Sequence, residues 1–236
     1  MLRVPFKNEE YFNEYIKENE ESLKEYTEFL SDKRVLKERL YLLKNKIFEE
    51  KLEIMVAKYS RGDDIDTLRL DYKSALELWR ETSFKDKIEY YYTINLWFVS
   101  LTVLLDMGDD IVETVKRKLE QENINDWLLN FILAKGEKEP AQIEGQLLVP
   151  KESQALKNAI CASDKNQLIH YLEKEWYSNF KDCGWYDSHK LSKRNFQIYF
   201  GYWCFEAAAV MKLLKWDDSD LVDQQYYPYD LAHYKK

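Results

Sequence analysis

The stretch YYYTINLWFVSLTVLL, residues 90–105, decides the fold class, because sixteen positions pass without one charged side chain. A helix that is apolar on all sides is buried in the middle of a bundle. The run is shorter than the ~20 residues that a membrane-spanning helix needs, and it holds Thr93, Asn95, Ser100 and Thr102. We therefore expect a buried central helix over 84–107 and no membrane role.

Apolar residues with a helical period continue on both sides of this run. Only six Gly and four Pro interrupt the chain, as expected for long helices joined by short connections. Gly62 is expected to end a helix in the left-handed conformation. Ser83 is expected to cap the central helix that begins at residue 84. The pattern predicts helices over 8–30, 33–60, 63–81, 84–107, 109–122, 126–134, 151–161, 164–178 and 188–200, then an apolar stretch after Gly201.

These elements predict an all-α fold, a helical bundle in two packed helical units. We place the N-terminal domain at 1–124 and the C-terminal domain at 125–236. Between the predicted helices, KGEKEPAQIEGQLLVPKES (135–153) is the longest connection and the richest in Gly and Pro. A connection of this length is usually functional or packed over the surface.

The chain is acidic, with 43 Asp and Glu against 35 Lys and Arg and a net charge of −8. This balance disfavours non-specific binding to nucleic acid and suits a basic partner, although charge alone decides nothing, since many cytosolic proteins are equally acidic. The three cysteines are far apart and form no C-x-x-C pair, as expected of free thiols in a reducing compartment. The N-terminus lacks the apolar stretch of a secretory signal, so we expect a cytoplasmic protein.

Sequence signatures of catalysis are missing. His170, His189 and His233 are never four residues apart, and neither G-x-S-x-G nor a glycine-rich phosphate loop occurs. Cys204 lies between two aromatic residues, where burial makes a thiol inert. We expect no catalytic residue, no metal and no cofactor.

Glu206 is the one carboxyl that is expected inside a buried helix, directly before three alanines. A buried carboxylate must be paired, hydrogen-bonded or protonated. The structural interpretation is an internal ion pair or a hydrogen bond to a tyrosine hydroxyl. The functional alternative is an enzyme that uses Glu206 as an acid in a pocket.

Acidic clusters occur at the predicted turns between helices. Helix capping explains such clusters, but they also suit the surface of a protein that binds a cationic partner. Our candidate partner-binding residues are Asp217, Asp218, Asp220 and Asp223, followed by Asp63, Asp64 and Asp66.

The C-terminal sequence GYWCFEAAAVMKLLKWDDSDLVDQQYYPYDLAHYKK (201–236) resembles that of the PoNi family, immunity proteins against PoNe-type nuclease toxins. The resemblance rests on an aromatic pair before F-E-A-A-A, a D-D-S turn and a terminal Y-Y-P-x-D-L. R-E-T-S-F-K-D-K at 80–87 is similar to part of the family's N-terminal helical domain. The motif residues Trp203, Phe205, Glu206, Tyr227, Pro228 and Asp230 are expected to determine the fold rather than to contact a partner.

The resemblance implies a cytoplasmic protein that binds and silences a DNase toxin in the bacterium that produces it, without chemistry of its own. Its partner would be the cognate toxin, held by occlusion. Two alternatives remain open at this stage: a helical scaffold or regulator with another protein partner, and the enzyme that uses Glu206.

Overall fold

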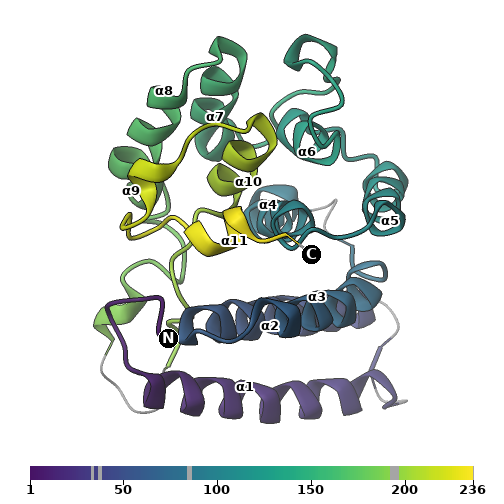
Figure 1. Ribbon diagram of the computed structural model, residues 1–236. Helices are drawn as coiled ribbons and strands as arrows, with labels where there is room; N and C mark the ends of the chain where they lie inside the picture. The colour runs from purple at the N-terminus through teal and green to yellow at the C-terminus, as the bar shows by residue number, and fades with distance from the viewer. Residues whose placement is uncertain (33–34, 37–38, 84–86, 192–196, 236) are drawn as a thin grey trace. The chain divides into compact units, whose positions relative to one another are not determined.

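The computed structural model describes residues 1–32, 35–36, 39–83, 87–191 and 197–235 (Figure 1). The fold is all-α, as predicted: no strand occurs in the part described, where one isolated backbone pairing joins Asp126 and Gln146. The chain forms two compact units, and neither is continuous in sequence. One comprises Met1–Phe84 and Asp187–Gly201, and the other Lys85–Tyr186 and Tyr202–Lys236. The predicted domain boundary at 124/125 divides the chain once along its sequence, whereas these two units are defined by spatial contacts. The boundary therefore stays a prediction.

The first unit is built on three long helices, α1 (Glu9–Leu30), α2 (Leu40–Arg61) and α3 (Ile65–Trp79). α2 lies between the other two and packs along both of them (Figure 1). As predicted, Gly62 ends α2 with φ +104°, and a Cβ atom there would meet the Met1 backbone. Only a residue without a side chain fits both restraints.

The predicted helix over 188–200 is wrong for the residues that the structure describes. Ser188–Lys190 forms one 3₁₀ turn, and residues 197–204 are not helical; 192–196 lie outside the described residues. The backbone here bonds to side chains of the first unit instead. The Tyr199 amide donates to the Tyr11 hydroxyl at 3.0 Å, and the Phe200 carbonyl accepts from Ser60 at 2.7 Å. These bonds hold both aromatic residues in the core in an extended conformation.

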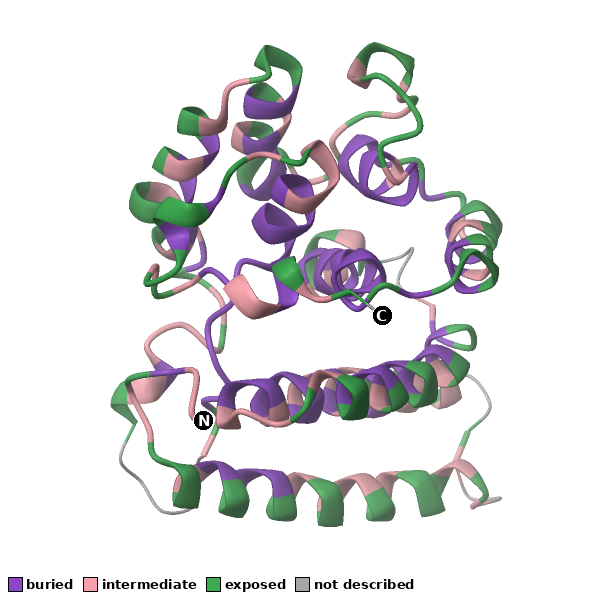
Figure 2. Ribbon diagram, viewed as in Figure 1, coloured by how far each residue is buried: buried purple, intermediate pink, exposed green. Residues whose placement is uncertain are grey.

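The second unit forms around α4 (Ile88–Leu104), the uncharged run that decides the fold class. α4 is buried along almost its whole length, which confirms the expectation for this helix (Figure 2). It packs on α10 (Phe205–Leu214), α6 (Trp127–Leu133), α5 (Asp109–Gln121) and α11 (Tyr229–His233).

The predicted cap at Ser83 concerns residues 84–86, which lie outside the described residues, and it stays a prediction. The described part of α4 begins at Ile88, with Lys87 as its N-cap. The Ser83 amide donates to the Asn45 side chain at 3.1 Å, and its carbonyl accepts from the same side chain at 2.6 Å. The buried Asn45 amide thus holds the Ser83 backbone through two hydrogen bonds.

Three helical segments complete the second unit: α7 (Pro150–Ala162), α8 (Lys165–His170) and α9 (Trp176–Asn179). The helix predicted over 164–178 exists, but Tyr171–Glu175 forms a π-helical turn within it. Such a turn inserts an extra residue and changes the direction of the side chains that follow. It lies directly before Trp176, which is fully buried.

Asp126 attaches the long connection to the second unit. Its buried carboxylate accepts from the amides of Leu128 and Leu129 at the start of α6, and from the Leu148 amide at 2.8 Å. The Tyr92 hydroxyl of α4 donates to the same carboxylate at 3.1 Å. Among the described residues, no helix is long and apolar enough to cross a membrane.

Candidate partner interface

The first acidic cluster lies in the segment that joins α10 to α11, around the 3₁₀ turn Ser219–Leu221. Asp217, Asp220 and Asp223 are exposed there. Lys165, at the start of α8, donates to the Asp217 carbonyl at 2.7 Å and lies 3.7 Å from the Asp220 carboxylate. Asp223 has no ion pair in the part described. Contact of these three side chains with a partner stays a prediction.

Asp218 differs from its neighbours, because only 6% of its surface is exposed. Its carboxylate accepts from the Tyr227 hydroxyl at 2.6 Å and lies 2.8 Å from His233 Nε2. Burial, together with the hydrogen bond to Asp218, raises the pKa of Tyr227. Asp218 thus joins the segment after α10 to Tyr227 and His233. Little of its carboxylate remains exposed to a partner.

The second acidic cluster lies at the turn between α2 and α3, where two of its three members have local roles. Arg61 forms a two-pronged ion pair with Asp63, at 2.8 and 2.6 Å. Asp64 caps α3 by accepting from the Asp66 amide at 2.8 Å. Only Asp64 has the helix-capping role that is the alternative to partner binding. Contact of this cluster with a partner again stays a prediction.

The acidic side chains of α1 were missed as candidates. This helix carries eight glutamates and two lysines, and all eight glutamates are exposed. Its buried residues are Phe12, Tyr15 and Ile16, so one narrow apolar side contacts the unit and the rest faces solvent (Figure 2). The spacing of the glutamates was visible in the sequence.

The C-terminal motif that carries the resemblance lies mostly in the core. Trp203, Phe205 and Glu206 are buried, and so are Tyr227 and Pro228, whereas Asp230 is half-buried. The Cys204 amide donates to the Tyr226 carbonyl at 2.8 Å, which joins the start of α10 to the C-terminal segment. Cys204 is itself fully buried, and burial raises the pKa of its thiol, as expected.

Glu206 is fully buried, but its partners differ from those we expected. Its Oε1 accepts from Trp176 Nε1 at 2.7 Å and from the Cys204 thiol at 3.3 Å, not from a cation or a tyrosine. Oε2 has no hydrogen-bond partner among the described residues. Desolvation raises the pKa of Glu206 to about 7. A carboxyl without access to solvent cannot meet a substrate, which removes the main support for the enzyme alternative.

Another buried carboxyl, Glu152 on α7, was missed by sequence reasoning. It is 8% exposed and accepts from the Thr93 hydroxyl at 2.8 Å. Desolvation raises its pKa to about 7, and the charge of Glu206 contributes to the rise. Its position in an apparently polar first turn of α7 gave no sign that the side chain would turn inward.

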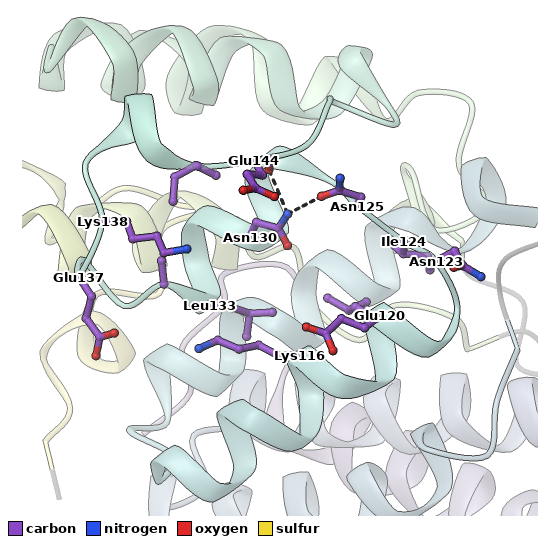
Figure 3. A pocket seen from close by; sticks show the side chains of 13 residues that line it. Lys116, Glu120, Asn123, Ile124, Asn125, Asn130, Leu133, Glu137, Lys138 and Glu144 are labelled. Carbon is purple, nitrogen blue, oxygen red and sulfur yellow. Dashed lines mark hydrogen bonds between the residues drawn. The ribbon is translucent and has the colours of Figure 1, made fainter.

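A surface pocket of about 580 Å³ lies between α5, α6 and the long connection (Figure 3). Its wall includes Lys116 and Glu120 of α5 and Lys138 and Glu144 of the connection. Asn130 donates to the Glu144 carbonyl at 3.0 Å and to the Asn125 side chain at 2.9 Å, so the connection is held against α6. Neither Glu206 nor Glu152 lines this pocket. In the part of the chain that is described, no group of three or more His, Cys, Asp and Glu could hold a metal ion.

These features define an all-α protein in which Glu152 and Glu206 are buried in the core, whereas the glutamates of α1 are exposed at the surface. Two family models match the chain, PoNe immunity protein (PoNi), N-terminal, over residues 3–117, and PoNe immunity proteins (PoNi), C-terminal, over residues 124–231. The chain belongs to the PoNi family, immunity proteins against PoNe toxins, which is not a family of enzymes. Comparison with curated proteins and with solved structures found no significant match.

Proposed function

We propose that this chain neutralises a cognate PoNe-type DNase toxin by covering the basic surface with which the toxin binds DNA, in the cytoplasm of the producing bacterium. The observation that carries the proposal is the family match over nearly the whole chain. The acidic surface supplies the physical part. A DNase must present cations to phosphates, and exposed carboxylates attract the same cations.

Three groups of acids suit this role. The exposed glutamates of α1 form the largest excess of acids over bases in any one helix, and Glu18, Glu21 and Glu25 have no ion pair in the part described. Asp217, Asp220 and Asp223 form the second group, and Asp63, Asp64 and Asp66 come after them. Charges of this kind mainly accelerate association, by tenfold or more at low salt, while packed contacts slow dissociation.

Co-expression with the adjacent toxin gene tests the immunity role. Cells that express the toxin alone should die, cells that also express this chain should survive, and cells with a catalytically inactive toxin should grow in both cases. Death despite expression of this folded chain would contradict the proposal.

Occlusion needs a separate test, because an immunity protein could also act away from the DNA site. Duplex DNA and this chain should compete for the inactive toxin, so that excess DNA lowers the fraction of toxin bound to the chain. A stable ternary complex of toxin, chain and DNA would contradict occlusion and leave the immunity role intact.

A further inference from the structure

The long connection between α6 and α7 (135–149) is held in place although it adds nothing to the core. The structure describes the whole of this connection, and none of its residues is buried. It therefore gains little hydrophobic stabilisation against the conformational entropy that its ordering costs. Hydrogen bonds hold it instead: the Gln146 carbonyl accepts from the Trp127 amide at 3.0 Å, and the Glu144 carbonyl accepts from Asn130 at 3.0 Å. What the ordered connection adds to the unit is surface.

Gly145 brings this connection close to the start of α6. Its φ is +105°, and a Cβ atom there would lie 2.8 Å from the Asn125 carbonyl oxygen. Only glycine meets both conditions. The neighbouring Ile143 and Glu144 then line the pocket of about 580 Å³, whose other side is α5 (Figure 3). The connection is thus one wall of a cavity.

The pocket combines apolar surface with acids that the unit leaves unpaired. Leu119, Leu133 and Ile143 line it, and such residues can contact the methylene stem of a long side chain. Glu120 and Glu144 are exposed, and neither forms an ion pair within the described part of the chain. A side chain that enters the pocket meets both kinds of surface.

The charges of the lining favour a cation. Three glutamates and two lysines line the pocket, and Lys116 is already paired with Glu113 at 2.8 Å. Lys138 remains, and Figure 3 shows it across the pocket from Glu120. An anion would gain Lys138 alone, whereas a cation can approach both Glu120 and Glu144.

Arginine suits this lining better than lysine does. A guanidinium carries five donors in one plane, so it can bond to carboxylates and to a carboxamide oxygen at the same time. Asn130 supplies such an oxygen, because its amide nitrogen already donates to Asn125 and Glu144 and so turns its Oδ1 to another side. An ammonium ion is more strongly hydrated and loses more when it leaves water. The volume is within the range of ligand pockets and also admits the residues that flank the arginine.

We propose that the pocket between α5 and the long connection receives an arginine side chain of the basic protein partner, with Glu120 and Glu144 as its counter-ions. This inference rests on the proposed function, because it names a contact within the complex with the toxin. It also gives the long connection a role, which is to carry Glu144 to that arginine.

Calorimetric titration of the inactive toxin with variants of the full chain tests the inference. Glu120→Gln combined with Glu144→Gln keeps the shape of the pocket and removes both counter-ions, so Kd should rise at least about tenfold. The matched control combines Glu89→Gln with Glu173→Gln, at two exposed glutamates of the same unit that do not line the pocket. It removes the same total charge and should leave Kd within about threefold of the wild type.

Labelling of arginine with phenylglyoxal, read by mass spectrometry of the toxin, tests the identity of the inserted side chain. At least one toxin arginine should be protected in the complex with the wild-type chain. The same arginine should be labelled in the complex with the Glu120→Gln, Glu144→Gln variant at saturating concentration.

The outcomes separate the two proposals. Failure of the folded wild-type chain to bind the toxin would overturn the proposed function and the pocket contact together. Normal binding by the Glu120→Gln, Glu144→Gln variant, or an equal loss in the control, would overturn the pocket contact alone. If no toxin arginine is protected in the complex with the wild-type chain, the contact is overturned whether or not the variant folds.

Discussion

The replacement Glu206→Gln tests whether burial in the core of the second unit keeps the Glu206 carboxyl protonated. Glu206 is fully buried, one of its oxygens accepts from Trp176 and Cys204, and the other has no partner among the described residues. Glutamine keeps the shape and the accepting oxygen, but it cannot ionise. The substitution therefore isolates the effect of a buried negative charge.

The size of that effect follows from the pKa. Burial raises the pKa of Glu206 from 4.5 to about 7. Between these values the unfolded chain has already released a proton that the native state still holds, so the free energy of unfolding falls as the pH rises through this window. A rise of about 2.5 units at about 1.4 kcal/mol per unit gives a loss of about 3 kcal/mol, complete above pH 7.

Urea denaturation of both proteins at pH 5 and at pH 8 measures this loss. On going from pH 5 to pH 8, wild type should lose about 3 kcal/mol more stability than Glu206→Gln. Glu137→Gln, at an exposed glutamate of the same unit, should follow the wild type at both pH values. A difference between wild type and Glu206→Gln that does not change with pH would refute the account of a protonated buried acid.

The remaining predictions concern the surface acids and the C-terminal segment. Asp218→Ala leaves the buried Tyr227 hydroxyl without its acceptor and should cost about 2–3 kcal/mol in urea denaturation, whereas Asp223→Ala should stay within about 0.5 kcal/mol. Equal costs would show that Asp218 does not fasten the segment. Replacing Glu18, Glu21 and Glu25 together by Lys should slow association with the toxin at least about tenfold, with no loss of helix by circular dichroism. An unchanged association rate, measured by stopped-flow fluorescence, would exclude α1 from the interface. For the wild type, raising NaCl from about 0.05 to 0.5 M should slow association by about tenfold or more, and a rate independent of salt would contradict charge-guided encounter.

Strong local signals made much of the helical fold predictable. The uncharged run of α4 indicated a buried helix, Gly62 indicated the end of α2, and Asp64 the start of α3. Each of these depends on residues a few positions apart, and such signals can be read from one sequence.

Features that depend on tertiary contacts were not predictable. The segment at 197–200 has a helical pattern, but its backbone bonds to Tyr11 and Ser60, which lie more than 130 residues away. The partner of Glu206 could not be named either, since Trp176 lies 30 residues away in the sequence. Tertiary bonds of this kind override local propensity.

The candidate surface was predictable in charge but not in detail. Four aspartates at 217–223 look equivalent in the sequence, yet the fold buries Asp218 and leaves its neighbours exposed. Sequence spacing shows which charges share a turn, but only the folded chain shows which of them reach a partner.

The most direct measurement titrates the purified toxin with this chain and follows the cleavage of duplex DNA. Neutralisation by binding predicts that nuclease activity falls linearly with added chain, reaches a sharp stoichiometric end point at nanomolar concentrations, and returns when the complex is separated in high salt. Full nuclease activity in the presence of excess folded chain would contradict the account.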